Sequence, residues 1–253
     1  MNALNILLEF FLRILPGLIV GITFILLFGK KYLAVRIFSY ILLFIAMRDV
    51  FAPLNVWKVG GTEGVFWLRM IEDPVFLILG SLLCIFLAVL LNKLDKEARQ
   101  LCVYIKKSLI HALSTGLIGA VISLIPMLLI YQFVPIENRG GEVTNSPVFL
   151  CLLLVFCLCV NFLEESIYRG YVQGYAERYF TPTKSAILSG ILFSFSHMFL
   201  AITVTDAGWG ILAFTAYVGI IAGLVRSKAG VIASTITHGV AIFFLVSDIN
   251  FFK

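Results

Sequence analysis

The sequence predicts an all-α, polytopic membrane protein with about eight transmembrane helices. Of its 253 residues, 61% are hydrophobic and 13% are charged, whereas a soluble domain carries about 25% charged residues. A membrane helix needs about 20 mainly apolar residues, and the polar segments between such runs are too few to cover a soluble core. The expected spans are residues 3–28, 33–50, 74–92, 109–134, 148–168, 185–204, 208–226 and 230–247.

The first two spans contain basic residues and need separate justification. Span 3–28 could be a signal peptide, but Arg13 lies inside it, no basic segment precedes it, and no small-residue cleavage site comes before GKKYLAVR. We therefore expect it to be a retained helix. Span 33–50 is the weakest of the eight, because Arg36 and Arg48 shorten its apolar part.

The connections around the third span divide the chain. Residues 92–107 (NKLDKEARQLCVYIKK) are amphipathic, and we expect a solvated cytoplasmic helix with basic anchors at the headgroups. This connection separates residues 1–108, the N-terminal helices, from residues 109–253, the C-terminal bundle, within one integrated membrane domain. Before the third span, Trp57 and Trp67 are typical of an aromatic belt at the membrane interface.

The loops differ in charge. Thirteen Lys and Arg residues fall in the loops on one side of the predicted membrane and five in the loops and tail on the other. Since cytoplasmic loops carry the excess of Lys and Arg, both termini are expected outside the cytoplasm. We attribute the net charge of +5 to this bias and not to nucleic-acid binding. The short loops fit a multi-pass integral protein of a prokaryotic plasma (inner) membrane.

Titratable residues within the spans gather in the C-terminal bundle. Glu164 and Glu165 follow sixteen uncharged residues, and a charge inside a bilayer costs at least about 2.5–3.5 kcal/mol. Arg169 can pair with Glu165 at i, i+4, while Glu164 points about 100° away on the helix and stays free for chemistry. In the alternative interpretation, the helix enters the headgroups here and both acids are solvated.

Two histidines lie in other apolar runs, His197 in GILFSFSHMFL and His238 in ASTITHGVAIFF. Each alone could be a hydrogen-bonded packing residue. Together with the glutamates they indicate a wet cavity between helices, in which Glu and His activate a water molecule and a second His donates to a developing oxyanion. Gly219 and Gly223 form a GxxxG pattern, to which we assign helix packing alone.

These residues resemble the motifs of a known family. EExxxR followed by Gly (Glu164, Glu165, Arg169), then FxxxH ending at His197, then a late His238 are similar to the CAAX-processing and bacteriocin-processing (CPBP, or Abi) intramembrane proteases. The resemblance covers roughly residues 148–247. It implies a glutamic-type endopeptidase in which Glu164 is the base, His197 its partner and His238 the oxyanion donor, with Glu165 and Arg169 as supporting residues.

One position departs from the family pattern. Four residues after the late His, where the family has Asn, this chain has Ile242. Losing one oxyanion donor costs about 10²–10³ in rate. Either another side chain substitutes, or turnover is slow, or the chain is inactive. Candidate substitutes are Ser234, Thr235 and Asn161, the last of which lies one turn before Glu165 and is expected to face the same cavity.

We expect no cofactor and no metal. Two Glu and two His could bind zinc, which is the alternative, but adjacent Glu side chains diverge on a helix and no HExxH-type pair is present. The expected partners are a protein or peptide substrate delivered from the membrane or its surface, and the lipid bilayer, but not nucleic acid. The sequence favours no particular substrate and no oligomeric state.

Two other functions compete with an intramembrane endopeptidase. A catalytically impaired relative could act as a membrane scaffold or regulator of a partner protein, as Ile242 suggests. A proton-coupled transporter could use the same Glu and His residues as a relay, but it would show internal repeat symmetry, and the sequence shows none.

Overall fold

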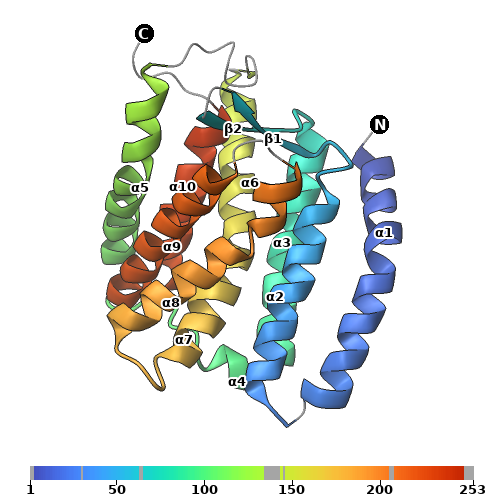
Figure 1. Ribbon diagram of the computed structural model, residues 1–253, viewed down its shortest axis with the longest axis vertical. Coiled ribbons are helices and arrows are strands. Elements are labelled where there is room, and N and C mark those ends of the chain that lie inside the picture. The colour runs from blue at the N-terminus through green and yellow to red at the C-terminus, as the bar shows by residue number, and fades with distance from the viewer. Residues whose placement is uncertain are drawn as a thin grey trace.

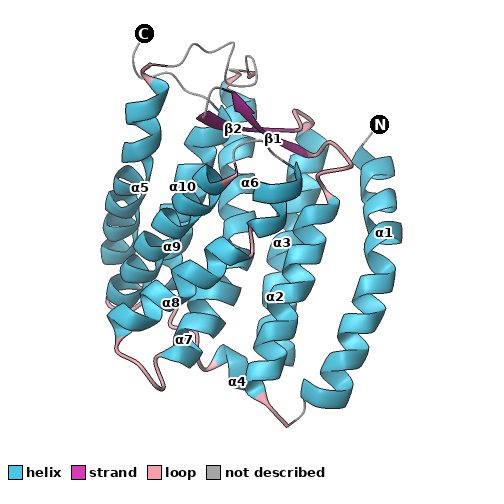
Figure 2. Ribbon diagram, in the orientation of Figure 1, coloured by secondary structure: helices cyan, strands magenta, loops and turns pink. Residues whose placement is uncertain are grey.

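The fold is a bundle of long helices with a small hairpin at one end (Figures 1 and 2). The computed structural model describes residues 3–29, 31–62, 65–133, 143–144, 146–204 and 208–247. Within these residues the chain is an all-α polytopic membrane protein, as its composition predicts. The loop expected at 135–147 lies mostly outside the described residues.

A helix is found at each of the eight predicted spans. The helices are α1 (Ala3–Phe24) continued by η1 (Ile25–Gly29), α2 (Leu33–Val50), α3 (Pro74–Leu94), α4 (Lys96–Arg99), α5 (Leu109–Tyr131), α6 (Pro147–Glu165), the π-helical η3 (Ser166–Val172), α7 (Gln173–Ala176), α8 (Pro182–Phe195), η4 (Leu200–Val204), α9 (Trp209–Ala229) and α10 (Val231–Ser247). Six helical stretches among the described residues are long and apolar enough to cross a membrane. Of the other two spans, α2 carries three charged residues and α10 is only 17 residues long.

Local sequence explains where several of these helices begin. Proline occupies the first helical position of α3, α6 and α8, where its missing N–H is not needed. The side chain of Asp73 accepts from two backbone amides at the start of α3, and Ser108 accepts from the amide of His111 at the start of α5. Gly230 ends α9 at a φ of 99°, a conformation that favours glycine, and the chain turns directly into α10.

The connection before α3 is a β-hairpin, which the sequence analysis did not predict. Strands β1 (Trp57–Thr62) and β2 (Val65–Met70) pair antiparallel, with Trp57 opposite Met70. Trp57 is only 8% exposed, and its indole N–H donates to the backbone oxygen of Arg48 at 3.2 Å. The expectation that Trp57 belongs to an aromatic belt is therefore wrong, because this side chain packs inward under the hairpin.

The segment 92–107 is not the single solvated helix that we expected. Helix α3 ends at Leu94, and only the four residues of α4 continue the helical path. Beyond them, Val103 and Tyr104 accept backbone hydrogen bonds from the first residues of α10. The helix breaks at Asp95, whose buried carboxylate accepts hydrogen bonds from the Ala98 amide and from the Arg36 and Tyr40 side chains of α2.

The described chain begins and ends at the same end of the bundle, beside the hairpin, while α4, α7 and the start of α8 lie at the opposite end (Figure 1). This second end carries the loops rich in Lys and Arg. An even number of spans agrees with that arrangement. The assignment of the basic end to the cytoplasm stays a prediction.

Candidate active site

The end of α6 carries two buried carboxylates. Glu165 and its partner Arg169 are both 0% exposed, and Glu165 Oε1 lies 2.9 Å from Arg169 Nη1. Glu164 is also buried. The alternative in which both acids are solvated at the headgroups is therefore wrong. The helix widens into the π-helical η3 directly after them, and such irregular turns are frequent at functional sites.

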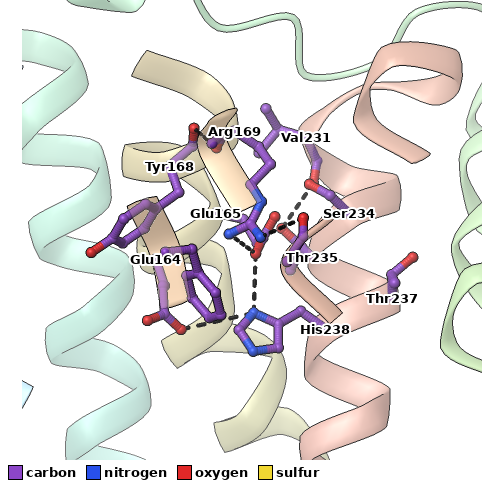
Figure 3. A network of polar contacts seen from close by, with 12 residues as sticks. Glu164, Glu165, Tyr168, Arg169, Val231, Ser234, Thr235, Thr237 and His238 are labelled. Carbon is purple, nitrogen blue, oxygen red and sulfur yellow. Dashed lines mark hydrogen bonds and ion pairs between the residues drawn. The ribbon is translucent and has the colours of Figure 1, made fainter. Parts of the chain in front are cut away.

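Glu165 connects two helices, as Figure 3 shows. The same Oε1 that faces Arg169 also lies 3.0 Å from Nδ1 of His238, on α10. A carboxylate accepts and does not donate, so Nδ1 of His238 carries the proton. Removing one partner from such a buried pair costs about 3–5 kcal/mol, because it leaves an uncompensated charge. Glu165 thus orients the imidazole of His238.

Arg169 is held by α9 as well. Its Nη2 donates to the carbonyl of Gly219 at 2.9 Å, and its guanidinium lies 4.5 Å from the ring centre of Phe193. A Cβ at position 219 would come within 3.1 Å of Nη2 and of the backbone of Gly190. The GxxxG pattern therefore does more than pack helices, since it also leaves room for the arginine that neutralises Glu165.

Glu164 has a different environment. Its Oε2 lies 3.8 Å from His238 Nδ1, which is too far for a hydrogen bond. Among the described residues, its Oε1 has no hydrogen-bond partner at all. Figure 3 shows the two carboxylates on either side of one imidazole nitrogen. Of the pair, Glu164 is the carboxylate available to an incoming molecule.

His197 lies in the turn just after α8. The predicted span 185–204 is interrupted here, because α8 ends at Phe195 and η4 resumes at Leu200. Nδ1 of His197 is 2.9 Å from the carbonyl of Phe193, and Nε2 is 3.1 Å from Nη1 of Arg48 on α2. Helix α8 runs obliquely through the bundle (Figure 1), and His197 just after its end lines the same cavity as Glu164.

The ring of Phe193 separates the two histidines. Its centre lies 4.6 Å from that of His197 and 5.2 Å from that of His238, which it meets edge-on at 84°. Tyr168 packs edge-on against it from η3 at 5.2 Å. The first residue of FxxxH is therefore a spacer that fixes how far apart the imidazoles sit.

Of these side chains, Glu164, Phe193, His197 and His238 border one cavity of about 230 Å³. Its polar lining includes Arg48, Asn161, Glu164, His197 and His238. Most of the remaining lining is apolar and comes from α1, α2, α3, α6, α9 and the hairpin. The site thus lies at the edge of a mainly hydrophobic chamber, to which the N-terminal helices contribute much of the wall.

The candidate replacements for the missing Asn are not equally placed. The hydroxyls of Ser234 and Thr235 donate to the carbonyl of Val231 at 3.0 and 2.9 Å, along their own helix. Asn161 lines the cavity, with Nδ2 donating to the carbonyl of Cys157 at 2.7 Å and one N–H left over. Ile242 lines the same cavity.

Among the described residues, no group of three or more His, Cys, Asp or Glu side chains is arranged to hold a metal ion. Glu165 and His238 instead contact each other, and Glu165 and His197 each contact an arginine.

A family model described as "Type II CAAX prenyl endopeptidase Rce1-like" matches residues 146–244. This part of the chain is similar to the Rce1-like family. Comparisons with curated proteins and with solved structures give no match.

The Rce1-like segment runs from the start of α6 almost to the end of α10. It contains Glu164, Glu165, Arg169, His197 and His238, the residues on which the resemblance rests. The match supports a CAAX-type intramembrane protease as the class of protein, at the level of the family.

Arg48 lies outside the Rce1-like segment and was missed by the sequence analysis, which placed any chemical site wholly in the C-terminal bundle. Its charge was interpreted as a limit on the second span and counted among the basic residues of the loop that follows. One signal could have found Arg48. An arginine beside an apolar run is costly to bury in a membrane protein, and such residues usually pair with a buried partner. No spacing rule links it to His197, 149 positions away.

Proposed function

We propose that this protein is an intramembrane endopeptidase that hydrolyses a peptide bond near the C-terminus, or in the membrane-proximal part, of a protein or peptide. Water activated by Glu164 and His197 attacks the bond, and His238 stabilises the oxyanion. The observation that carries the proposal is Glu164, a buried carboxylate bordering the cavity together with both histidines and with one oxygen unpartnered among the described residues. The Rce1-like family supports the same reaction class.

In the proposed reaction, Glu164 takes a proton from a water molecule as the water oxygen bonds to the carbonyl carbon. His197, which lines the same cavity, orients that water. When the tetrahedral intermediate collapses, the C–N bond breaks and the proton passes from Glu164 to the leaving amine. A positioned general base contributes typically about 10²–10⁴-fold to such a reaction.

The geometry around His238 supports its role as oxyanion donor. With Nδ1–H directed at Glu165, the imidazole is fixed in orientation and its Nε2 edge is left for another partner. To donate from Nε2, the ring must carry both protons. Glu165, neutralised in part by Arg169, is the acceptor for the first of them.

The cavity favours a substrate that enters with an apolar segment, from the membrane or its surface. The matched family is described as a CAAX prenyl endopeptidase. Prenylated peptides ending in a CAAX sequence are therefore the first substrates to test, beside the same peptides without the lipid. The proposed mechanism uses no metal.

The test is cleavage of quenched fluorescent peptides by protein purified in nanodiscs. We expect Glu164→Gln to lower kcat by about 10²–10⁴-fold, with large losses also for His197→Gln and His238→Gln. His111→Gln is the matched control, because His111 lies on α5 and is not among the residues lining the cavity. Full activity in the Glu164→Gln variant would refute the base assignment, and loss with chelator that zinc restores would refute metal independence.

The second candidate function is a membrane scaffold or regulator of a partner protein. It is favoured by one observation, the apolar Ile242 lining the cavity on the same helix as His238. Folded wild-type protein that cleaves no member of a broad peptide library would favour the scaffold over the enzyme.

A further inference from the structure

Arg48 reaches the site from α2, outside the Rce1-like segment. Each of its nitrogens has a partner of its own. Nε lies 2.8 Å from Oδ1 of Asp49, Nη1 lies 3.1 Å from Nε2 of His197, and Nη2 donates to the carbonyl of Ser196 at 2.6 Å. The residue also lines the cavity that holds Glu164 and His238.

These contacts fix the tautomer of His197. A guanidinium has donors only, so Nε2 of the imidazole must be the acceptor in this pair. The proton of the neutral ring then sits on Nδ1, where it can be donated to the carbonyl of Phe193 at 2.9 Å. Both contacts therefore favour the same form of His197, with the Nε2 lone pair on the side of Arg48, and removing Arg48 would leave only the Phe193 carbonyl to favour it.

The other terminal nitrogen of Arg48, Nη2, binds the backbone next to His197. Ser196 follows the last residue of α8, where helix carbonyls lack intrahelical partners. A cation at a helix C-terminus is favourable both as a hydrogen-bond donor and through the helix dipole. Nη2 can thus remain on the Ser196 carbonyl while the Nη1 contact with His197 is exchanged for another.

We propose that Arg48 is a positioning residue that holds His197 as the Nδ1–H tautomer with its Nε2 lone pair aimed into the cavity. This inference rests on the proposed function, in which His197 orients the attacking water. That water takes the place of Nη1 at Nε2, while Nη2 stays on Ser196 and keeps the ring in place. The N-terminal helices therefore supply a positioning residue of the site, Arg48, in addition to part of the cavity wall.

The test exploits the composition of the chain, which has only three histidines. Protein labelled with ¹⁵N-histidine gives three imidazoles in NMR spectra, and His197→Gln identifies the signals of residue 197 by their loss. We expect wild-type His197 as the Nδ1–H tautomer. Arg48→Met should shift it toward the Nε2–H form, and so should Arg48→Lys, which keeps the charge but cannot serve both acceptors at once.

Arg36→Met is the matched control. Arg36 lies on the same helix and makes at least as many side-chain contacts as Arg48, but its partners are Asp95, Glu97 and the Gly29 carbonyl, none of which lines the cavity. Its loss should leave the tautomer of His197 unchanged. In the cleavage assay, Arg48→Met should lower kcat by about 10²-fold, the loss expected for a misplaced catalytic group, with KM unchanged.

An unchanged His197 tautomer in Arg48→Met or in Arg48→Lys overturns the proposal, whatever the activity. A changed tautomer with undiminished kcat overturns the link to catalysis. If the wild-type protein cleaves no peptide, the proposed function fails, but the tautomer experiment still decides whether Arg48 sets the form of His197.

Discussion

Glu164 and Glu165 are neighbours in the chain but have opposite surroundings. Glu165 is enclosed by Arg169 and His238 and has no exposed surface. Glu164 borders the cavity, and one of its oxygens has no hydrogen-bond partner among the described residues. The cause is helical geometry, which separates adjacent side chains by about 100°. The end of one helix can thereby hold Glu165 in fixed contacts and leave Glu164 available to a molecule in the cavity.

The residue-level prediction concerns the oxyanion donor missing at Ile242. If Asn161 supplies the second donor, Asn161→Ala should lower kcat by about 10²-fold. Adding Ile242→Asn to that variant places an amide one turn beyond His238 and should restore most of the loss. The comparison is steady-state cleavage by the two single variants, the double variant and wild type. Asn161→Ala with undiminished kcat would remove Asn161 from the mechanism.

Among the elements, α2 has a polar contact at each end. Near its start, Arg36 bonds to Asp95 at 2.7 Å, and near its end Arg48 contacts His197. Burial disfavours the charged form of Asp95, but hydrogen bonds from Arg36, the Ala98 amide and Tyr40 outweigh it. The pKa of this carboxyl therefore lies below its usual value of 3.8. The helix is tied to the α3–α4 junction at one end and to the site at the other.

This network predicts a dependence of stability on pH. A carboxyl whose pKa is lowered by folding stabilises the protein above its unfolded pKa of about 3.8, and that contribution is lost as pH falls through the folded-state value. Asp95→Asn should therefore cost about 1.5–3 kcal/mol near neutral pH and lose less stability than wild type on acidification. Thermal unfolding in detergent as a function of pH measures both effects.

The control for that experiment is Glu9→Gln, which breaks the exposed Arg13–Glu9 pair on α1. Exposed pairs of this kind contribute about 0.3–0.5 kcal/mol, so its curve should follow that of wild type. Parallel pH curves for Asp95→Asn and wild type would contradict the role assigned to Asp95.

At the same scale, the helices were predictable and their interruptions were not. Apolar runs mark the helices at all eight predicted spans, because the bilayer imposes both length and composition. The hairpin at Trp57–Met70, the break after Leu94 and the turn at His197 depend on partners that are remote in sequence. The site was predictable where its members follow motif spacing, as Glu165 and Arg169 do. Arg48 follows no such spacing.

In the molecule as a whole, the two parts of the chain are not separable around the cavity. Helices α1, α2 and α3 and the hairpin form much of its wall, while the motif residues come from the C-terminal bundle. The helix pairs α3–α6 and α1–α3 pack directly, and one core cluster includes residues of α1, α3, α6, α10 and the hairpin. A fragment limited to residues 146–244 would keep the motifs but lose the contact between Arg48 and His197.

The enclosure of α10 has a consequence for the surrounding lipid. Each residue from Val231 to Ser247 is buried or half-buried, and none is exposed. Lipid therefore meets other helices and not the one that carries His238, so the position of His238 does not depend on how well α10 matches a bilayer core of about 30 Å. Peptide cleavage in nanodiscs of increasing acyl-chain length should therefore change little, and a rate that follows bilayer thickness would contradict this.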